Sequence, residues 1–164
     1  MAEEKQNTVN AEQPQGMALH AQYIKDLSLE IPFAPEIFKE IAKENPKVGI
    51  DINIANKPLE DDMYEVALTA KINADVADKK LFILELTYAT LATIKVPAEH
   101  LEPILYIELP RLLFPFVRNI VATNLTEAGL PPMLITPIDF VALYQARKAK
   151  EAENAAKNAT KESA

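Results

Sequence analysis

The stretch Tyr64-Glu-Val-Ala-Leu-Thr-Ala-Lys-Ile-Asn73 alternates apolar and polar side chains almost without a break. This period of two is typical of a β-strand with one face on a core and the other toward water. The same alternation recurs in three further stretches: Leu27–Ile31, Val48–Ile54 and Leu81–Tyr88. The links over residues 57–62 and 75–80 are short, which favours antiparallel neighbours. The sequence therefore predicts a four-stranded antiparallel sheet.

After Pro97 the pattern changes to the spacing of a helix. Apolar residues follow one another every three or four positions from Leu113 to Leu125. Pro110 suits the first position of this helix, and Gly129 suits a left-handed cap at its end. Asp139 is a candidate N-cap for a C-terminal helix that begins at Phe140. Strands followed by helices indicate an α+β fold. The longer link over residues 32–46 is expected to hold one or two helical turns.

The two ends of the chain differ from this body in composition. Residues 1–16 are polar and lack aromatic side chains, so they are predicted to be a disordered arm. Residues 17–144 are predicted to form one domain, and residues 145–164 a helix extension that frays into a flexible tail from about residue 155.

Composition excludes several classes of function. The 164 residues carry 24 acidic and 17 basic side chains, and a net charge of −7 is unsuited to nucleic acid or an anionic membrane. There is no cysteine, no apolar leader and no run of about 20 apolar residues, so a cytoplasmic protein is expected. His20 and His100 lie far apart, without a third ligand at metal spacing, and three glycines make no phosphate loop. The sequence predicts no metal, no cofactor and no enzymatic activity; an enzyme built on carboxylates or hydroxyls is the less favoured alternative.

The apolar surface exceeds what one chain of this size is expected to bury. The long helix is apolar around most of its circumference, and one sheet cannot cover it on every side. A homo-oligomer resolves the excess, with Leu84, Leu86 and Tyr88 of the fourth strand predicted at the interface.

Four blocks of the chain resemble the SecB protein-export family in their order and spacing from about Tyr23 to Tyr144. They are Tyr23-Ile-Lys-Asp-Leu-Ser-Leu-Glu30, Leu59-Glu-Asp-Asp-Met-Tyr-Glu-Val66, Leu112-Leu-Phe-Pro-Phe-Val-Arg118, and Leu130-Pro-Pro-Met-Leu-Ile-Thr-Pro-Ile-Asp-Phe140 with Leu143-Tyr144. The chain departs from the family at Ala89-Thr90-Leu91-Ala92, where a Gly-Ile-Phe is usual, and at Leu109-Pro110, where Cys-Pro is frequent. Without this Gly and Phe, the resemblance does not predict the backbone conformation at residues 89–92, nor one apolar contact that the family has there.

The resemblance implies a homotetramer, a dimer of dimers with helices between two eight-stranded sheets. It implies an ATP-independent chaperone that captures unfolded precursor proteins and delivers them to the motor SecA. Matching positions place the SecA contact on Asp26, Glu30, Ile83 and Glu85; the alternative is that these acids only keep the sheet soluble. A chaperone dedicated to an antitoxin is the alternative function on the same fold.

Client binding is expected on nine apolar residues of the first long link, the second strand and the loop between the helices. They are Phe33, Ile37, Phe38, Val48, Ile50, Ile52, Leu130, Met133 and Leu134. For the link, the alternative is a hydrophobic lid on the core, which the residue pattern alone favours. For the second strand and the loop, the alternative is a core position.

Overall fold

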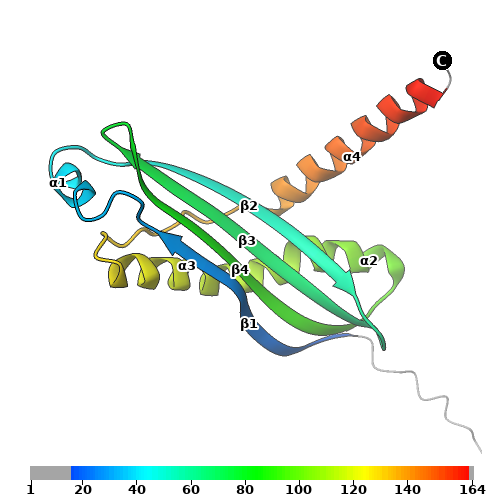
Figure 1. Cartoon of the computed structure of the whole chain (residues 1–164). Helices are drawn as coiled ribbons and strands as arrows, with labels where there is room; N and C mark the ends of the chain where they lie inside the picture. The colour runs from blue at the N-terminus through cyan, green and yellow to red at the C-terminus, as the bar shows by residue number, and fades with distance from the viewer. Residues whose placement is uncertain (1–15, 163–164) are drawn as a thin grey trace, which may run out of the picture.

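The computed structural model describes residues 16–162 of the chain. Four strands form one antiparallel sheet in the order β1-β4-β3-β2. Their bounds are Gly16–Glu30 for β1, Lys47–Pro58 for β2, Met63–Val76 for β3 and Lys79–Lys95 for β4. The predicted α+β order of a sheet, a long helix and a C-terminal helix is confirmed (Figure 1).

Helices cover one face of this sheet and extend beyond it. The short α1 (Ile37–Ile41) lies in the link between β1 and β2. A continuous helical run follows β4 and consists of α2 (Ala98–Pro103), the π-helical turn η1 (Ile104–Glu108) and α3 (Leu109–Glu127). Figure 1 shows this run across one side of the sheet, while α4 (Phe140–Glu162) projects away from it. None of the described helices is both long enough and apolar enough to cross a membrane.

The core lies between α3 and the sheet face that we call the inner face. Leu68 and Ile72 of β3 and Leu84 and Leu86 of β4 contribute fully buried side chains from the sheet. Leu113, Val117, Val121 and Leu125, spaced three or four residues apart, contribute the matching stripe from α3. The side chains predicted to face inward from a period of two in the strands and of 3.6 in the helix therefore pack together in one core.

The first strand is eleven residues longer at its start than the predicted Leu27–Ile31, and Gly16 belongs to it rather than to the arm. Its register against β4 shifts twice, between Leu19 and Ala21 and between Ile24 and Asp26. Each irregularity breaks the alternation of faces, which hides the strand from a search for a strict period of two. The remaining arm, residues 1–15, lies outside the described residues.

Pro110 lies in the first turn of α3, one residue after the predicted first position, although the helical run as a whole already begins at Ala98. Pro110 has no N–H with which to close an ordinary helical turn. The chain adopts the wider turn η1 just before it, where the Leu109 N–H donates to the Ile104 carbonyl.

The two helix caps were predicted correctly. Gly129 has a φ of 78°, and the Leu130 N–H donates to the Leu125 carbonyl over 2.9 Å, as in a C-terminal glycine cap. The Ala142 N–H donates to Asp139 Oδ1 over 3.0 Å at the start of α4. The expected fraying from residue 155 is wrong, because α4 continues to Glu162. Alanine-rich composition and the ion pairs Arg147–Glu151 and Lys157–Glu153, each four residues apart, stabilise this extension.

Candidate functional site

The register of the strands gathers the four predicted motor-contact residues on the outer face of the sheet, opposite α3. Glu30 lies across from Ile83 on β4, and Ser28 lies across from Glu85. Asp26 precedes Ser28 by two residues on β1, opposite Thr87 of β4, and therefore lies on the same face. Asp26 and Glu30 are exposed, Ile83 is 42% exposed, and Glu85 is half-buried. The four side chains therefore form one patch, with the apolar Ile83 at one end beside Glu30, which we call the acidic patch.

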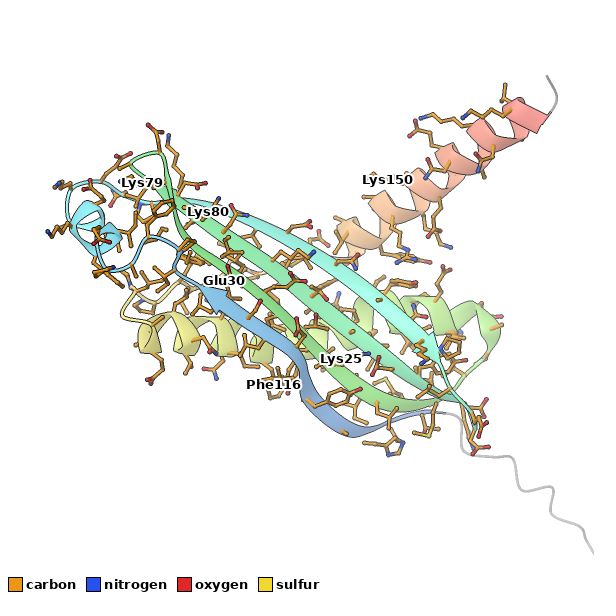
Figure 2. All side chains as sticks on the ribbon, in the orientation of Figure 1. Lys25, Glu30, Lys79, Lys80, Phe116 and Lys150 are labelled. Atoms are coloured by element: carbon orange, nitrogen blue, oxygen red, sulfur yellow. The ribbon has the colours of Figure 1, made fainter. Side chains whose placement is uncertain are left out.

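The outer face is not acidic throughout, in contrast to the expectation from the resemblance. Lys71 of β3 lies beside the acidic patch, with its Nζ 3.6 Å from Glu85 Oε1. Lys80 pairs with Asp75 over 2.8 Å at the neighbouring β3–β4 turn (Figure 2). The negative charge is thus concentrated at the β1–β4 side of this face.

Further along the outer face, Tyr23, Lys25 and Glu65 form a second polar cluster. The Tyr23 hydroxyl and the Lys25 ammonium both donate to the Glu65 carboxylate, reaching across β4 from β1 to β3. The hydrogen bonds from Lys25 and then Tyr23 lower the pKa of Glu65. The hydrogen bond to Glu65 raises the pKa of Tyr23 to about 12. This cluster ties the irregular β1 to the centre of the sheet.

The nine predicted client-binding residues divide into three groups by exposure. Five are well exposed although apolar: Phe33, Phe38, Val48, Ile50 and Leu134. Ile52 and Met133 are half-buried.

Ile37 and Leu130 are 1% and 5% exposed, so both lie in the core of the single chain, and their assignment to client binding stays a prediction. Ile37 is the inward residue of α1, and Leu130 follows the Gly129 cap, where an apolar side chain commonly folds back on the helix. The burial of both side chains is what the core alternative expects.

The exposed aromatic residues are fixed at one end of the sheet. A Cβ added to Gly129 would lie 3.7 Å from Phe38 Cε1, so the Phe38 ring packs over the end of α3. The Lys79 ammonium lies 6.0 Å from the centre of the Phe33 ring, at the β3–β4 turn. Figure 1 shows α1 at this same end, next to the start of β2, where Val48 and Ile50 lie. We call Phe33, Phe38, Val48, Ile50 and Leu134 the apolar surface.

A groove beside β2 was missed in the sequence. Its volume is about 400 Å³, and it lies between the second half of β2, the π-helical turn and the start of α4. Tyr106 stacks on Tyr144 with ring centres 6.0 Å apart, and the Arg147 guanidinium lies 4.1 Å from the centre of the Tyr106 ring. Tyr144 belongs to the last of the four blocks that resemble the family. Tyr106 lies in the η1 turn, which the sequence did not predict, so its place beside Tyr144 was not predicted either.

The predicted oligomer contacts are covered within a single chain. Leu84 and Leu86 are fully buried beneath α3, so they leave no surface for a second copy. Tyr88 is 8% exposed because its ring stacks on Phe116, with ring centres 5.8 Å apart.

Other apolar side chains are exposed on α3 and on the inner face of β1. They are Met17, Leu19, Ile24, Leu112 and Phe116, and Phe116 is labelled in Figure 2. A single chain leaves these side chains exposed to solvent, whereas the inward side chains Leu84 and Leu86 of β4 are already covered by α3.

Comparison with known proteins identifies the family. A family model described as "Preprotein translocase subunit SecB" matches residues 10–151. The chain belongs to the SecB family. The "Protein-export protein SecB" of Paramagnetospirillum magneticum is 51% identical over 136 residues, which cover 82% of this chain and 86% of that protein. The protein of the same name from Rhodospirillum rubrum is 42% identical over 144 residues, or 87% and 89% of the two chains.

A solved structure shares the SecB fold of this chain at much lower sequence identity. It is a SecB-like chaperone of Mycobacterium tuberculosis in complex with a ChAD peptide from the HigA1 antitoxin. The identity is 12%, the TM-score is 0.62, and the match covers 74% of this chain and 90% of that one. The departure at Ala89-Thr90-Leu91-Ala92 leaves β4 continuous in this chain, with Ala89 and Ala92 fully buried.

Proposed function

We propose that this SecB is a cytoplasmic, ATP-independent chaperone that binds unfolded precursor proteins and delivers them to SecA for export. The apolar surface carries this proposal. Large apolar side chains exposed on a protein surface indicate a binding site, and a client without fixed structure is recognised by buried area rather than by sequence. The relatives named for protein export, at 42–51% identity, support the same function.

The half-buried Ile52 and the groove beside β2 extend the proposed client site along an edge strand. β2 is an edge strand of the sheet, and within residues 16–162 no strand pairs with its free side. An extended segment can pair with such an edge while its side chains enter neighbouring hollows. Tyr106 and Tyr144 supply aromatic contact area for such side chains.

A matched pair of substitutions tests client capture. Ile50 and Ile83 are 44% and 42% exposed, one on each face of the sheet. Ile50→Glu is expected to weaken capture of an unfolded precursor at least tenfold, because a charge on an apolar contact must be desolvated. Ile83→Glu is expected to leave capture unchanged, and ATP is expected to release nothing. Equal capture by both variants, with circular dichroism confirming their fold, would reject the apolar surface as the client site.

The acidic patch is the proposed contact for SecA. Asp26 and Glu30 are exposed and lie outside the core, which suits attraction of a basic segment. Asp26→Lys and Glu85→Lys are expected to weaken SecA binding, more at low salt than at moderate salt, without loss of client capture. Glu127→Lys on α3 is the control with the same change in charge. Unchanged SecA affinity in a folded Asp26→Lys, Glu85→Lys double variant would remove this assignment.

We further propose that the chain assembles as a dimer of dimers. The exposed apolar side chains on α3 and on the inner face of β1 support this arrangement, as does the free edge of β1. The antitoxin-dedicated alternative is not favoured. The only support for it is a likeness in fold at 12% identity.

A further inference from the structure

One row of residues crosses the outer face through the middle of the acidic patch. Asp51 of β2 lies opposite Lys71 of β3, Lys71 lies opposite Glu85 of β4, and Glu85 lies opposite Ser28 of β1. All four side chains share the outer face. Lys71 is therefore placed between two carboxylates, and its Nζ lies 3.6 Å from Glu85 Oε1.

The three acids of the acidic patch differ in their partners. Within residues 16–162, Asp26 and Glu30 have no ion pair, whereas Glu85 already has one with Lys71. The side chains of this pair are 57% and 40% exposed, so a cation from outside can reach Glu85. A basic partner therefore meets two free carboxylates and one that an internal lysine occupies.

We propose that Lys71 competes with SecA for Glu85 and thereby limits the affinity of the acidic patch. This inference rests on the proposed docking of SecA at that patch. When a basic side chain of SecA engages Glu85, Lys71 exchanges its partner for Asp51, which lies directly opposite it on β2 and on the same face. Asp51 thus reduces the cost of displacing Lys71, because the lysine regains a carboxylate. The arrangement favours rapid exchange over tight binding.

The size of the effect follows from the exposure of the pair. Ion pairs on a protein surface shift an equilibrium by at most about fivefold. Lys71→Gln is therefore expected to lower the dissociation constant for SecA about two- to fivefold at low salt, with a smaller gain at moderate salt. The gain is expected to lie mainly in the Glu85 contact, since Asp26 and Glu30 are free in both proteins.

A control must separate this competition from a general gain of negative charge. Lys57→Gln changes the net charge equally on the same face. Lys57 lies opposite Glu65, which is six residues from Lys71 along β3, or about 20 Å. Purified SecA is titrated against full-length protein carrying either substitution, alone and combined with Glu85→Gln. Circular dichroism and light scattering establish that each variant is folded and assembled.

Three results support the proposal together: Lys71→Gln tightens binding, Lys57→Gln does so markedly less, and Glu85→Gln abolishes the advantage of Lys71→Gln. Equal gains from both lysine substitutions would show a general charge effect and overturn it. Unchanged or weaker binding by Lys71→Gln would show that Lys71 does not compete for Glu85, and would overturn it as well. A failure of the proposed SecA docking has a different signature, because the Asp26→Lys, Glu85→Lys double variant would then bind as tightly as the unaltered protein.

Discussion

At the scale of single residues, the Tyr23–Glu65 hydrogen bond makes stability depend on pH. The neutral Tyr23 hydroxyl donates to the Glu65 carboxylate, so folding raises the pKa of Tyr23 from 10.0 to about 12. This contribution is fully present below pH 10 and is lost as the pH rises toward 12. We expect Tyr23→Phe to be less stable than the unaltered protein at pH 8, and the difference to shrink between pH 10 and 12. Urea unfolding of both proteins across this range measures the difference.

The same contact predicts a spectroscopic result. Tyrosine labelled at Cζ should show Tyr23 titrating near pH 12, and Glu65→Gln should return its pKa toward 10.0 because the hydrogen bond to a carboxylate is removed, and with it the negative charge. The substitution is expected to leave the strand β1, which carries Lys25, folded as before. A Tyr23 resonance that titrates near pH 10 in the unaltered protein would contradict the cluster.

The direction in which a side chain points was predictable where side chains alternate along a strand, and was not predictable where the chain turns. Asp26, Glu30, Ile83 and Glu85 lie on one face, as a period of two requires. Phe38 is exposed whereas Ile37, beside it in the same short helix, is buried. A helix of five residues is too short to show an apolar stripe, so its inward residue cannot be identified from spacing alone.

At the scale of elements, the end of α3 depends on one glycine. Gly129 has a φ of 78°, and a Cβ there would meet only ordinary contact with Phe38. Backbone strain alone should therefore set the cost of Gly129→Ala, at about 1–2 kcal/mol of unfolding free energy. Gly49→Ala is the control, because Gly49 lies in β2 without a positive φ and its added Cβ would lie 3.4 Å from Asn73 Oδ1. Urea unfolding at equal protomer concentration compares the two; an equal cost for both would contradict the cap.

The length of an element proved harder to predict than its type. Both helix caps were visible in sequence because Gly129 and Asp139 carry specific chemistry. The start of β1 was not visible, since its first half has no buried face to impose alternation. The π-helical turn before Pro110 was also missed, because a proline near the start of a helix does not by itself indicate a wider turn before it. The groove that contains Tyr106 was missed with it.

At the scale of the whole molecule, correcting the oligomer contacts changes the expected effect of substitutions. Leu112 is 45% exposed on α3, whereas Leu84 is fully buried in β4. We expect Leu112→Asp to dissociate the assembly and to keep the fold of each chain. Leu84→Asp is expected to unfold the chain, since it buries an unpaired charge at a cost of several kcal/mol.

Light scattering should give a mass of about four times 18.2 kDa for the unaltered protein. Leu112→Asp should give a smaller mass with an unchanged circular dichroism spectrum. A stable, folded monomer of the unaltered protein at micromolar concentration would reject the tetramer. An intact tetramer of Leu112→Asp would instead reject α3 as a contact between copies.

The sheet separates two kinds of surface by the thickness of one layer. The acidic patch lies on the outer face at β1 and β4, and the apolar surface lies at the opposite edge, with Val48 and Ile50 on the inner face of β2. On the proposed function, cargo and motor therefore occupy the chaperone concurrently, and neither has to leave before the other arrives. Cargo held by a line of weak contacts along one edge can be peeled off from its end, one contact after another. Tension from the motor would then suffice for unloading, without any change of shape in the carrier.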